Sequence, residues 1–245
     1  MYQLGVDEAG RGPAIGPLVV CALGIPTTDI GFLTNIGAKD SKSLTRKKRE
    51  NLAEKIYSEV EKRNWKVGLI TCSACRIDKE RDRTNLNNLE VELFKEAIIN
   101  TNIEKYNGKI YLDACDVNEQ RFGNRVKESL GQDWSQWTIE SKHKMDLDNI
   151  LVGAASILAK VHRDNEIKKI GQLLNLDIGS GYPSDPKTRV AIRNLIKEEY
   201  PNKYLRWSWA TIENIWAKEN GKPIPKREDI AVSYTHLTLP TILLV

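Results

Sequence analysis

Two apolar runs joined by a glycine-rich turn begin this sequence, and they constrain its fold more than any other feature. Residues 2–7 (YQLGVD) and residues 17–25 (PLVVCALGI) each have the composition and length of a short buried β-strand. The turn that separates them holds Gly10 and Gly12. The two strands are therefore predicted to pair antiparallel.

The rest of the chain contains both strand-like and helix-like segments. Three further strands are predicted at residues 65–73, 108–115 and 136–141. Helices are predicted at residues 45–63, 87–101, 119–130, 148–170, 187–199 and 208–219. Hairpin-like pairing first and alternation later favour one α/β domain with a mixed sheet. The small residues 153–156 would let the longest helix approach that sheet closely.

Composition indicates an ordinary globular protein, with 40% hydrophobic and 29% charged residues. Lys and Arg number 37 against 33 Asp and Glu, and this net charge of +4 is too small to identify a nucleic-acid partner. The sequence shows no signal peptide and no apolar run of the roughly 18 residues that span a bilayer. A soluble, cytoplasmic protein is therefore expected.

Cysteine is too sparse for a disulfide framework in a chain of this length. Cys72 and Cys75 have the C-x-x-C spacing, but no second Cys or His pair follows at the spacing of a zinc site. We interpret them as small buried thiols at the end of a strand, because free cysteine is among the most buried residue types.

The C-terminal segment differs in composition from the chain before it. Residues 231–245 (AVSYTHLTLPTILLV) are apolar and contain no Lys, Arg, Asp or Glu. We therefore divide the chain into a main domain (1–185), a helical C-terminal region (186–229) and a non-native or disordered tail (230–245).

Acidic residues occur at the ends of predicted elements. Asp7 and Glu8 are adjacent at the end of the first strand, and their charges repel unless a cation or proton lies between them. Asp113 ends the fourth strand, beside Asp7 if these two strands are neighbours. Asp146 lies at the entrance of the longest helix, where the helix dipole favours an ionised carboxylate.

Spacing alone leaves this acidic set open, because Asp116 could replace Asp113 and Asp148 could replace Asp146. An oxygen-only cluster suits hard cations such as magnesium or manganese and suits zinc poorly. Aspartate is also common as a cap at strand ends and helix starts, so spacing does not establish a metal site.

Three further features suit contact with nucleic acid. Gly10, Arg11 and Gly12 form a bare, basic turn that another molecule can approach closely. Lys42, in the loop of a basic stretch, is a candidate phosphate contact, whereas we interpret most of the basic residues after it as a solvated helix face. Tyr182 could stack on a sugar or base if exposed, but a buried loop anchor is the favoured interpretation from the residues alone.

These pieces, in this order, resemble ribonuclease HII, the type 2 ribonuclease H family, in its archaeal form. The resemblance runs from residue 1 to about residue 218 and is carried by GVDEAGRGPAIGPLVV, DSKSL, YLDACDVNEQRF, HKMD with AASILAKVHRD, GSGYPSDP and YPNKYLRWSW. It implies a ribonuclease H-like fold, a mixed five-stranded sheet flanked by helices with a small helical C-terminal region. Met145 departs from the alanine that is usual in the family's HKAD pattern.

The resemblance also implies roles for particular residues. The four metal-binding catalytic acids would be Asp7, Glu8, Asp113 and Asp146. The turn of Gly10, Arg11 and Gly12 would read the ribose 2′-hydroxyl at an RNA–DNA junction. Tyr182 would stack on the following deoxyribose, and Lys42 would be the family's loop lysine in the substrate site. His143 is a candidate for proton transfer or product release.

The activity implied is an endonuclease that hydrolyses the RNA strand of RNA–DNA hybrids. It would also cut 5′ of ribonucleotides embedded in duplex DNA, leaving a 3′-hydroxyl and a 5′-phosphate, with two Mg²⁺ or Mn²⁺ ions. The expected partners are those nucleic acids, and the chain is expected to be a monomer. Many archaeal relatives end in a motif that binds the sliding clamp, and none is recognisable here.

Three alternatives to this activity are considered, one a nuclease and two from other classes of function. Another nuclease of the same fold, such as a junction resolvase or ribonuclease HIII, would keep the acids and change the substrate. A non-catalytic binder of RNA–DNA hybrids would keep the turn and lose the chemistry, which the intact acidic set argues against. A phosphate loop is disfavoured because its lysine and hydroxyl are missing and a strand, not a helix, follows the turn.

Overall fold

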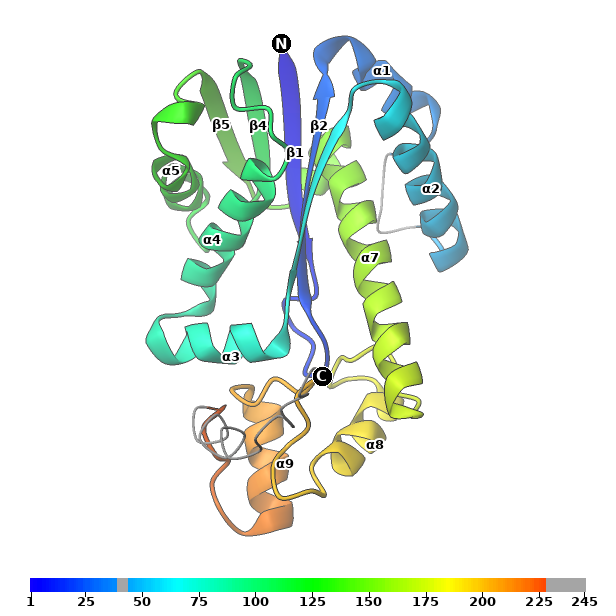
Figure 1. Ribbon diagram of the computed structural model, residues 1–245, viewed down its shortest axis with the longest axis vertical. Helices are drawn as coiled ribbons and strands as arrows, with labels where there is room; N and C mark the ends of the chain where they lie inside the picture. The colour runs from blue at the N-terminus through cyan, green and yellow to red at the C-terminus, as the bar shows by residue number, and fades with distance from the viewer. Residues whose placement is uncertain (39–43, 228–245) are drawn as a thin grey trace, which may run out of the picture.

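A five-stranded sheet forms the centre of the molecule (Figure 1). The computed structural model describes residues 1–38 and 44–227. The strands, in the spatial order β3-β2-β1-β4-β5, are β1 (Tyr2–Ala9), β2 (Leu18–Pro26), β3 (Lys66–Cys72), β4 (Gly108–Asp113) and β5 (Trp137–Lys142). β2 runs antiparallel to both β1 and β3, whereas β4 runs parallel to both β1 and β5. The predicted mixed five-stranded sheet is confirmed.

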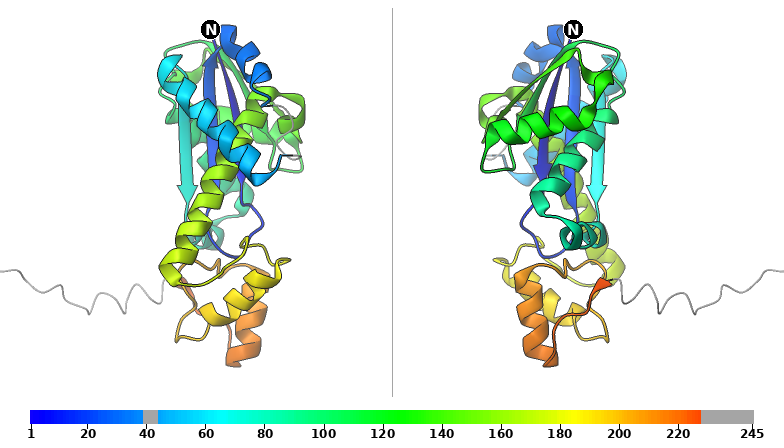
Figure 2. Two further views of the ribbon diagram at one scale, coloured as in Figure 1. Left: turned by 90° about the vertical axis from the view of Figure 1, so that its right-hand side faces the viewer. Right: turned by 90° about the vertical axis from the view of Figure 1, so that its left-hand side faces the viewer.

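Helices cover both faces of this sheet (Figures 1 and 2). One face carries α4 (Leu86–Ile99) and α5 (Glu119–Leu130), with α3 (Ala74–Arg83) packed against α4. The other face carries α7 (Ile150–Leu174), against which α1 (Ile30–Asn35) and α2 (Arg46–Lys62) pack. The remaining helices are α6 (Met145–Asp148), α8 (Pro186–Leu195), α9 (Ala210–Asn220) and two short 3₁₀ helices, η1 (Thr27–Asp29) and η2 (Gln132–Trp134).

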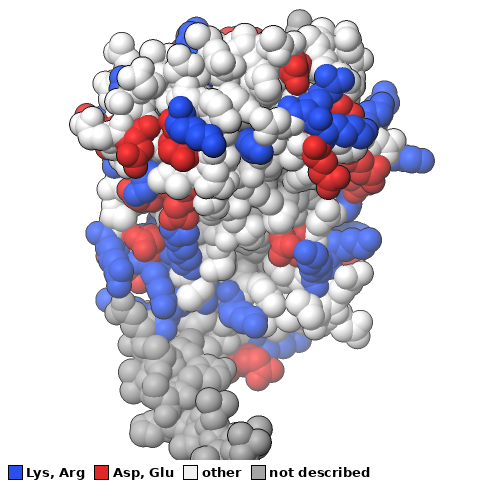
Figure 3. Space-filling view, turned by 45° about the horizontal axis from the view of Figure 1, so that its top comes forward, with Lys and Arg blue, Asp and Glu red and all other residues white. Residues whose placement is uncertain are grey.

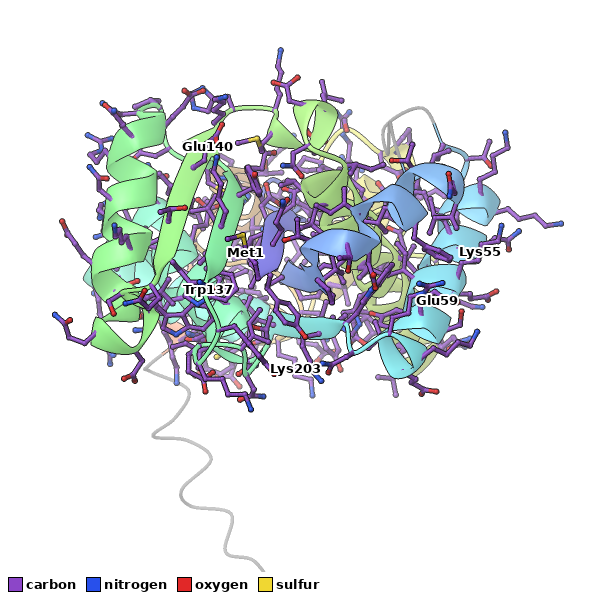
Figure 4. All side chains as sticks on the ribbon, turned by 90° about the horizontal axis from the view of Figure 1, so that it is seen from above. Met1, Lys55, Glu59, Trp137, Glu140 and Lys203 are labelled. Carbon is purple, nitrogen blue, oxygen red and sulfur yellow. The ribbon has the colours of Figure 1, made fainter. Side chains whose placement is uncertain are left out.

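The view from above shows how wide this layered part is (Figure 4). Lys55 and Glu59 of α2 lie toward one end of the molecule, and Trp137 and Glu140 of β5 lie toward the other. Met1, which precedes the central strand β1, lies between them. The first strand of the sequence is therefore placed in the middle of the sheet.

Strand β2 is buried on both faces, which explains its continuous apolar sequence. Its even-numbered residues, such as Val20, join the hydrophobic cluster beneath α4 and α5. Its odd-numbered residues, such as Cys21 and Leu23, join the cluster beneath α2 and α7. This alternation follows from the two-residue period of a strand.

The close approach of α7 to the sheet depends on a glycine in β1. A Cβ added at Gly5 would lie 2.6 Å from the carbonyl carbon of Leu151 and 2.6 Å from the amide nitrogen of Val152. On the helix, Ala154, Ala155 and the residues beside them are fully buried. The predicted close packing of the small-residue helix is confirmed, and Gly5 of the strand also makes it possible.

The substitution Gly5→Ala is expected to lower the free energy of unfolding by about 1–3 kcal/mol, because rigid backbone occupies the space that the new methyl group needs. Thermal unfolding followed by circular dichroism would measure this as a fall in Tm of roughly 2–4 °C per kcal/mol. Gly31→Ala in α1 is the matched control, since its Cβ would meet no atom within 4 Å. An unchanged Tm for Gly5→Ala would contradict the close packing described here.

The carboxyl-terminal helices α8 and α9 form a lobe beyond the end of β1 (Figures 1 and 2). Its apolar cluster also includes Ala14 and Ile15, which follow β1, and Ile167 and Ile170 of α7, so it spans the boundary predicted at residue 185. The buried carboxylate of Asp78 in α3 anchors the lobe by accepting hydrogen bonds from the following groups: the amides of Trp207 and Ser208, the Ser208 hydroxyl and Arg227 Nε.

Several elements differ from the prediction. α1 and α3 were not predicted, and α8 ends at Leu195 instead of near residue 199. The C-x-x-C segment spans the junction of β3 and α3, where Ser73 caps the helix. Burial raises the pKa of Cys72 to about 11, which keeps this thiol protonated at neutral pH. Among the described residues, no helix is long and apolar enough to cross a membrane.

Candidate active site

One pocket of about 490 Å³ gathers most of the candidate residues. It is lined by the four acids Asp7, Glu8, Asp113 and Asp146, by the turn Gly10-Arg11-Gly12 and by Tyr182. Lys42 lies outside the described residues. The pocket also contains four residues that the sequence did not single out individually for this site: Arg49, Lys160, Arg163 and Asp164.

The strand pairing explains why Asp7 and Asp113 meet. β1 and β4 are parallel neighbours with Val6 opposite Leu112, so the next residue of each strand reaches the same edge of the sheet. Burial and the charges of Glu8 and Asp113 raise the pKa of Asp7 well above its ordinary value. Burial also raises the pKa of Glu8, while the charges of Arg11 and Lys160 oppose that rise.

Helix α7 supports Asp7 from below. The fully buried hydroxyl of Ser156 hydrogen-bonds the Asp7 carboxylate and opposes the rise in its pKa. Lys160, one turn further along the helix, donates to Ser156 Oγ at 3.0 Å. A lysine, a serine and an aspartate from two elements thus form a short polar chain at the floor of the pocket.

On the face drawn in Figure 3, basic and acidic side chains are interspersed.

Asp146 occupies a short helix of its own and does not begin the long one. It lies in α6, which follows Lys144 in the left-handed conformation, and α7 starts only at Ile150. The N-cap of α7 is Asn149, whose side chain accepts from the amides of Leu151 and Val152. The prediction that Asp146 or Asp148 begins the long helix is therefore wrong, because Asn149, which follows Asp148, caps it.

The two alternative acids lie elsewhere. Asp116 is buried, and its carboxylate accepts hydrogen bonds from both Nε and Nη2 of Arg121, which lowers its pKa. Asp148 is exposed at the end of α6. Neither lines the pocket, whereas Asp113 does and accepts from the amide of Met145 at 2.9 Å.

The chemistry of the pocket fits a hard divalent cation. All four candidate ligands offer carboxylate oxygens, and neither histidine nor cysteine lines the pocket. Buried adjacent carboxylates with raised pKa values are stabilised by a cation between them. Within residues 1–38 and 44–227, no three carboxylate, thiol or imidazole groups are close enough to hold an ion as they stand. The carboxylates would have to turn toward one another to share one.

In the turn Gly10-Arg11-Gly12, called the GRG turn below, the carbonyl oxygens accept hydrogen bonds from side chains of the C-terminal lobe. Arg206 of the C-terminal lobe is fully buried and donates from Nη2 to the carbonyl of Gly10 at 2.6 Å and from Nη1 to that of Arg11 at 2.9 Å. Trp209 Nε1 donates to the carbonyl of Gly12 at 3.3 Å. The amides of the three turn residues donate no hydrogen bond to any described residue. The backbone amides of the turn are therefore available to donate hydrogen bonds to another molecule.

The two glycines of this turn serve different needs. Gly10 has a φ of +94°, and a Cβ there would lie 2.5 Å from Nε of the buried Arg163. Only glycine adopts that conformation without strain. A Cβ on Gly12 would lie in ordinary contact, 3.6 Å from the ring of Tyr182, so a side chain here would enter the space between turn and tyrosine.

Tyr182 is 38% exposed, which corrects the interpretation of this residue as a buried loop anchor. Its loop is fixed instead by neighbouring groups: Gly181 donates to the hydroxyl of Thr188, and Arg163 donates to the carbonyl of Ser180. The guanidinium of Arg163 lies 5.1 Å from the centre of the Tyr182 ring. The loop is therefore held from behind while the ring faces the pocket.

The sequence also did not mark Arg49, which lines the pocket, or Arg206, which holds the GRG turn without lining the pocket. Arg49 was assigned to a solvated helix face, yet it reaches the pocket from α2 and donates to the carbonyl of Leu44 at 2.7 Å. Arg206 lies about 195 residues from the turn that it holds. No local pattern marks either one, since only tertiary packing brings them to the site. His143 does not line the pocket; its ring contacts Glu119 and the carbonyl of Asp116.

Comparison with known proteins gives consistent matches. A family model described as Ribonuclease HII matches residues 4–212. Ribonuclease HII of Methanococcus maripaludis (strain C7) is 42% identical over 213 residues, which are 86% of each protein. The crystal structure of ribonuclease H2 from Pyrococcus horikoshii OT3 is similar with a TM-score of 0.79 at 36% identity, covering 91% of this chain and 100% of that one.

A second solved structure is similar to a lesser degree. It is the PCNA:RNase HII complex from Archaeoglobus fulgidus, with a TM-score of 0.73 at 33% identity over 85% of this chain and 95% of that one. The predicted ribonuclease H-like fold is confirmed by these matches.

Proposed function

Because this chain belongs to the ribonuclease HII family and is therefore an endonuclease acting on the RNA of RNA–DNA hybrids, we propose that it also cuts duplex DNA 5′ of a single embedded ribonucleotide. The proposed products carry a 3′-hydroxyl and a 5′-phosphate. One observation carries the proposal: a single pocket holds four carboxylates beside a turn whose carbonyls are tied back and whose amides are free of other described residues.

The four acids are the proposed metal ligands. Asp7, Glu8, Asp113 and Asp146 would hold two divalent ions, Mg²⁺ or Mn²⁺, which supply an activated water and neutralise charge on the phosphate. Ser156 and Lys160 orient the Asp7 carboxylate through the polar chain described above. Arg49 and Arg163 add positive charge at the pocket wall, where it would favour a phosphate.

The GRG turn is the proposed reader of the ribose. A 2′-hydroxyl both donates and accepts hydrogen bonds, and it is the group that distinguishes RNA from DNA at one position. Its oxygen would accept from the free amides of the turn, and Gly12 leaves room for the sugar between the turn and Tyr182. The exposed ring of Tyr182 would then stack on the following deoxyribose. Reading and cutting would thus take place in one pocket.

A cleavage assay tests this function directly. A DNA duplex carrying one ribonucleotide would be incubated with Mg²⁺ or with chelator, beside an all-DNA duplex and a continuous RNA–DNA hybrid. We expect a single metal-dependent cut on the 5′ side of the ribonucleotide, no cut in the all-DNA duplex, and cuts within the hybrid. The masses of the products identify the 3′-hydroxyl and 5′-phosphate ends.

The other outcomes separate the alternatives. Cutting of the hybrid alone would leave the nuclease and remove the proposed role of the GRG turn and Tyr182 at single ribonucleotides. Preference for a four-way junction would favour a resolvase, and binding without any cutting would favour a hybrid-binding protein. We propose a monomer whose partner is nucleic acid; the PCNA of the Archaeoglobus fulgidus complex lies outside this proposal.

A further inference from the structure

Side chains of helix α4 hold the side chain of Arg11, the central residue of the GRG turn. Arg11 Nε donates to Glu90 Oε1 at 2.7 Å, and Arg11 Nη2 donates to Asn87 Oδ1 at 2.8 Å. Glu90 and Asn87 are three residues apart and so lie on the same face of α4. The guanidinium is therefore fixed at two points, by a helix separate from the C-terminal lobe that holds the turn's carbonyls.

Burying the carboxylate of Glu90 at this position costs folding free energy. Its side chain is 0% exposed, and its Oε2 atom has no hydrogen-bond partner among the described residues. Burial raises its pKa to about 7 even though Arg11 lies against it. A buried ion pair seldom stabilises a fold more than an apolar pair of the same size would. Stability therefore does not explain a carboxylate at this position.

We propose that Glu90 is a positioning residue for recognition of the ribonucleotide: it holds Arg11 against α4 and so fixes the GRG turn from its side-chain face. This inference rests on the proposed function of that turn. Arg206 and Trp209 hold the main chain from the C-terminal lobe, and Glu90 with Asn87 holds the side chain from α4. The turn is thus fixed between two separate parts of the molecule.

Loss of the Glu90 charge would free Arg11 to move. The charge of Arg11 already acts on Glu8, the neighbouring acid of the pocket. A guanidinium released from α4 would be drawn toward that acid and would pull the turn with it. The expected consequence is poorer placement of the ribose relative to the acids, with the rest of the fold unchanged.

The test compares kcat/KM on the single-ribonucleotide duplex for the wild type, Glu90→Gln, Arg11→Met and the double variant. Glutamine keeps the shape and one acceptor oxygen of Glu90, so the variant is expected to fold with a Tm near that of the wild type. A charge-assisted hydrogen bond becomes a neutral one, and kcat/KM is expected to fall about tenfold. In the Arg11→Met background the same substitution should cause no further loss.

Glu92→Gln is the matched control, since Glu92 lies on the same helix, is half exposed and pairs with Lys95 outside the pocket. It is expected to leave kcat/KM unchanged. Unchanged activity of Glu90→Gln, or an equal loss with and without Arg11, would overturn the inference and leave the proposed function standing. A wild-type chain that cannot cut the single-ribonucleotide duplex would instead overturn the proposed function and this inference with it.

Discussion

Asp7→Asn is expected to lower kcat on RNA–DNA hybrids by about three orders of magnitude while leaving the Kd for the uncut hybrid within about threefold of the wild-type value. The amide keeps the size of the side chain and one acceptor oxygen but removes one charge from the proposed metal ligands. Single-turnover cleavage measures the first effect, and fluorescence anisotropy in chelator measures the second. Asp146→Asn is expected to behave in the same way.

The same variant should gain stability as it loses activity. Burial and the charges of Glu8 and Asp113 raise the pKa of Asp7 in the folded state. At pH values above the pKa of Asp7 in the unfolded chain, this residue therefore lowers the free energy of unfolding. In chelator at neutral pH, Asp7→Asn is therefore expected to unfold at a higher temperature than the wild type. Below the unfolded-state pKa the two proteins should differ less, because Asp7 is then protonated in both states.

Asp148→Asn provides the control, since Asp148 lies two residues from Asp146 but is exposed and outside the pocket. It should change neither kcat nor Tm appreciably. Near-wild-type cleavage by Asp7→Asn would remove that residue from the proposed metal site, and a lower Tm would contradict the electrostatic repulsion inferred for the pocket.

Arg206→Met is expected to destabilise the protein by about 3–5 kcal/mol and to abolish cutting at a single ribonucleotide. The substitution leaves the buried carbonyls of Gly10, Arg11 and Gly16 without their donors, each at a cost of roughly 1–3 kcal/mol, which do not add fully. Burial and the charge of Arg163 lower the pKa of Arg206 to about 9, so the residue is charged at neutral pH. Chemical denaturation would measure the loss.

Two further variants are to be compared with Arg206→Met. Arg206→Lys keeps the charge but not the planar fork of donors, and it should fall between the wild type and Arg206→Met. Arg193→Met, at an exposed position of α8, should leave stability and cleavage unchanged. If Arg206→Met unfolds like the wild type, the GRG turn does not depend on the C-terminal lobe.

Prediction of the fold succeeded where local pattern was strong. The antiparallel pairing of the first two strands, the five strands and the small-residue helix all follow from hydrophobic period and glycine placement. α3 was missed because it is polar and begins directly at the end of β3. The start of α7 was misplaced because three of the four positions from Asp146 to Asn149 are polar or acidic and offer competing caps.

The sequence by itself determined which chemistry this chain can hold: two adjacent acids at one strand end, a third acid at the end of another strand, and a glycine-flanked arginine. These depend on residue type and on short-range periodicity, which can be read along the chain. Tertiary structure alone decided which groups serve the site. Arg206 and Glu90 reach the turn from distant segments, Asp116 is taken by Arg121, and Tyr182 is exposed because Arg163 and Thr188 hold its loop. The contacts of Arg206 and Glu90 with the turn join residues far apart in sequence, and no local pattern encodes them.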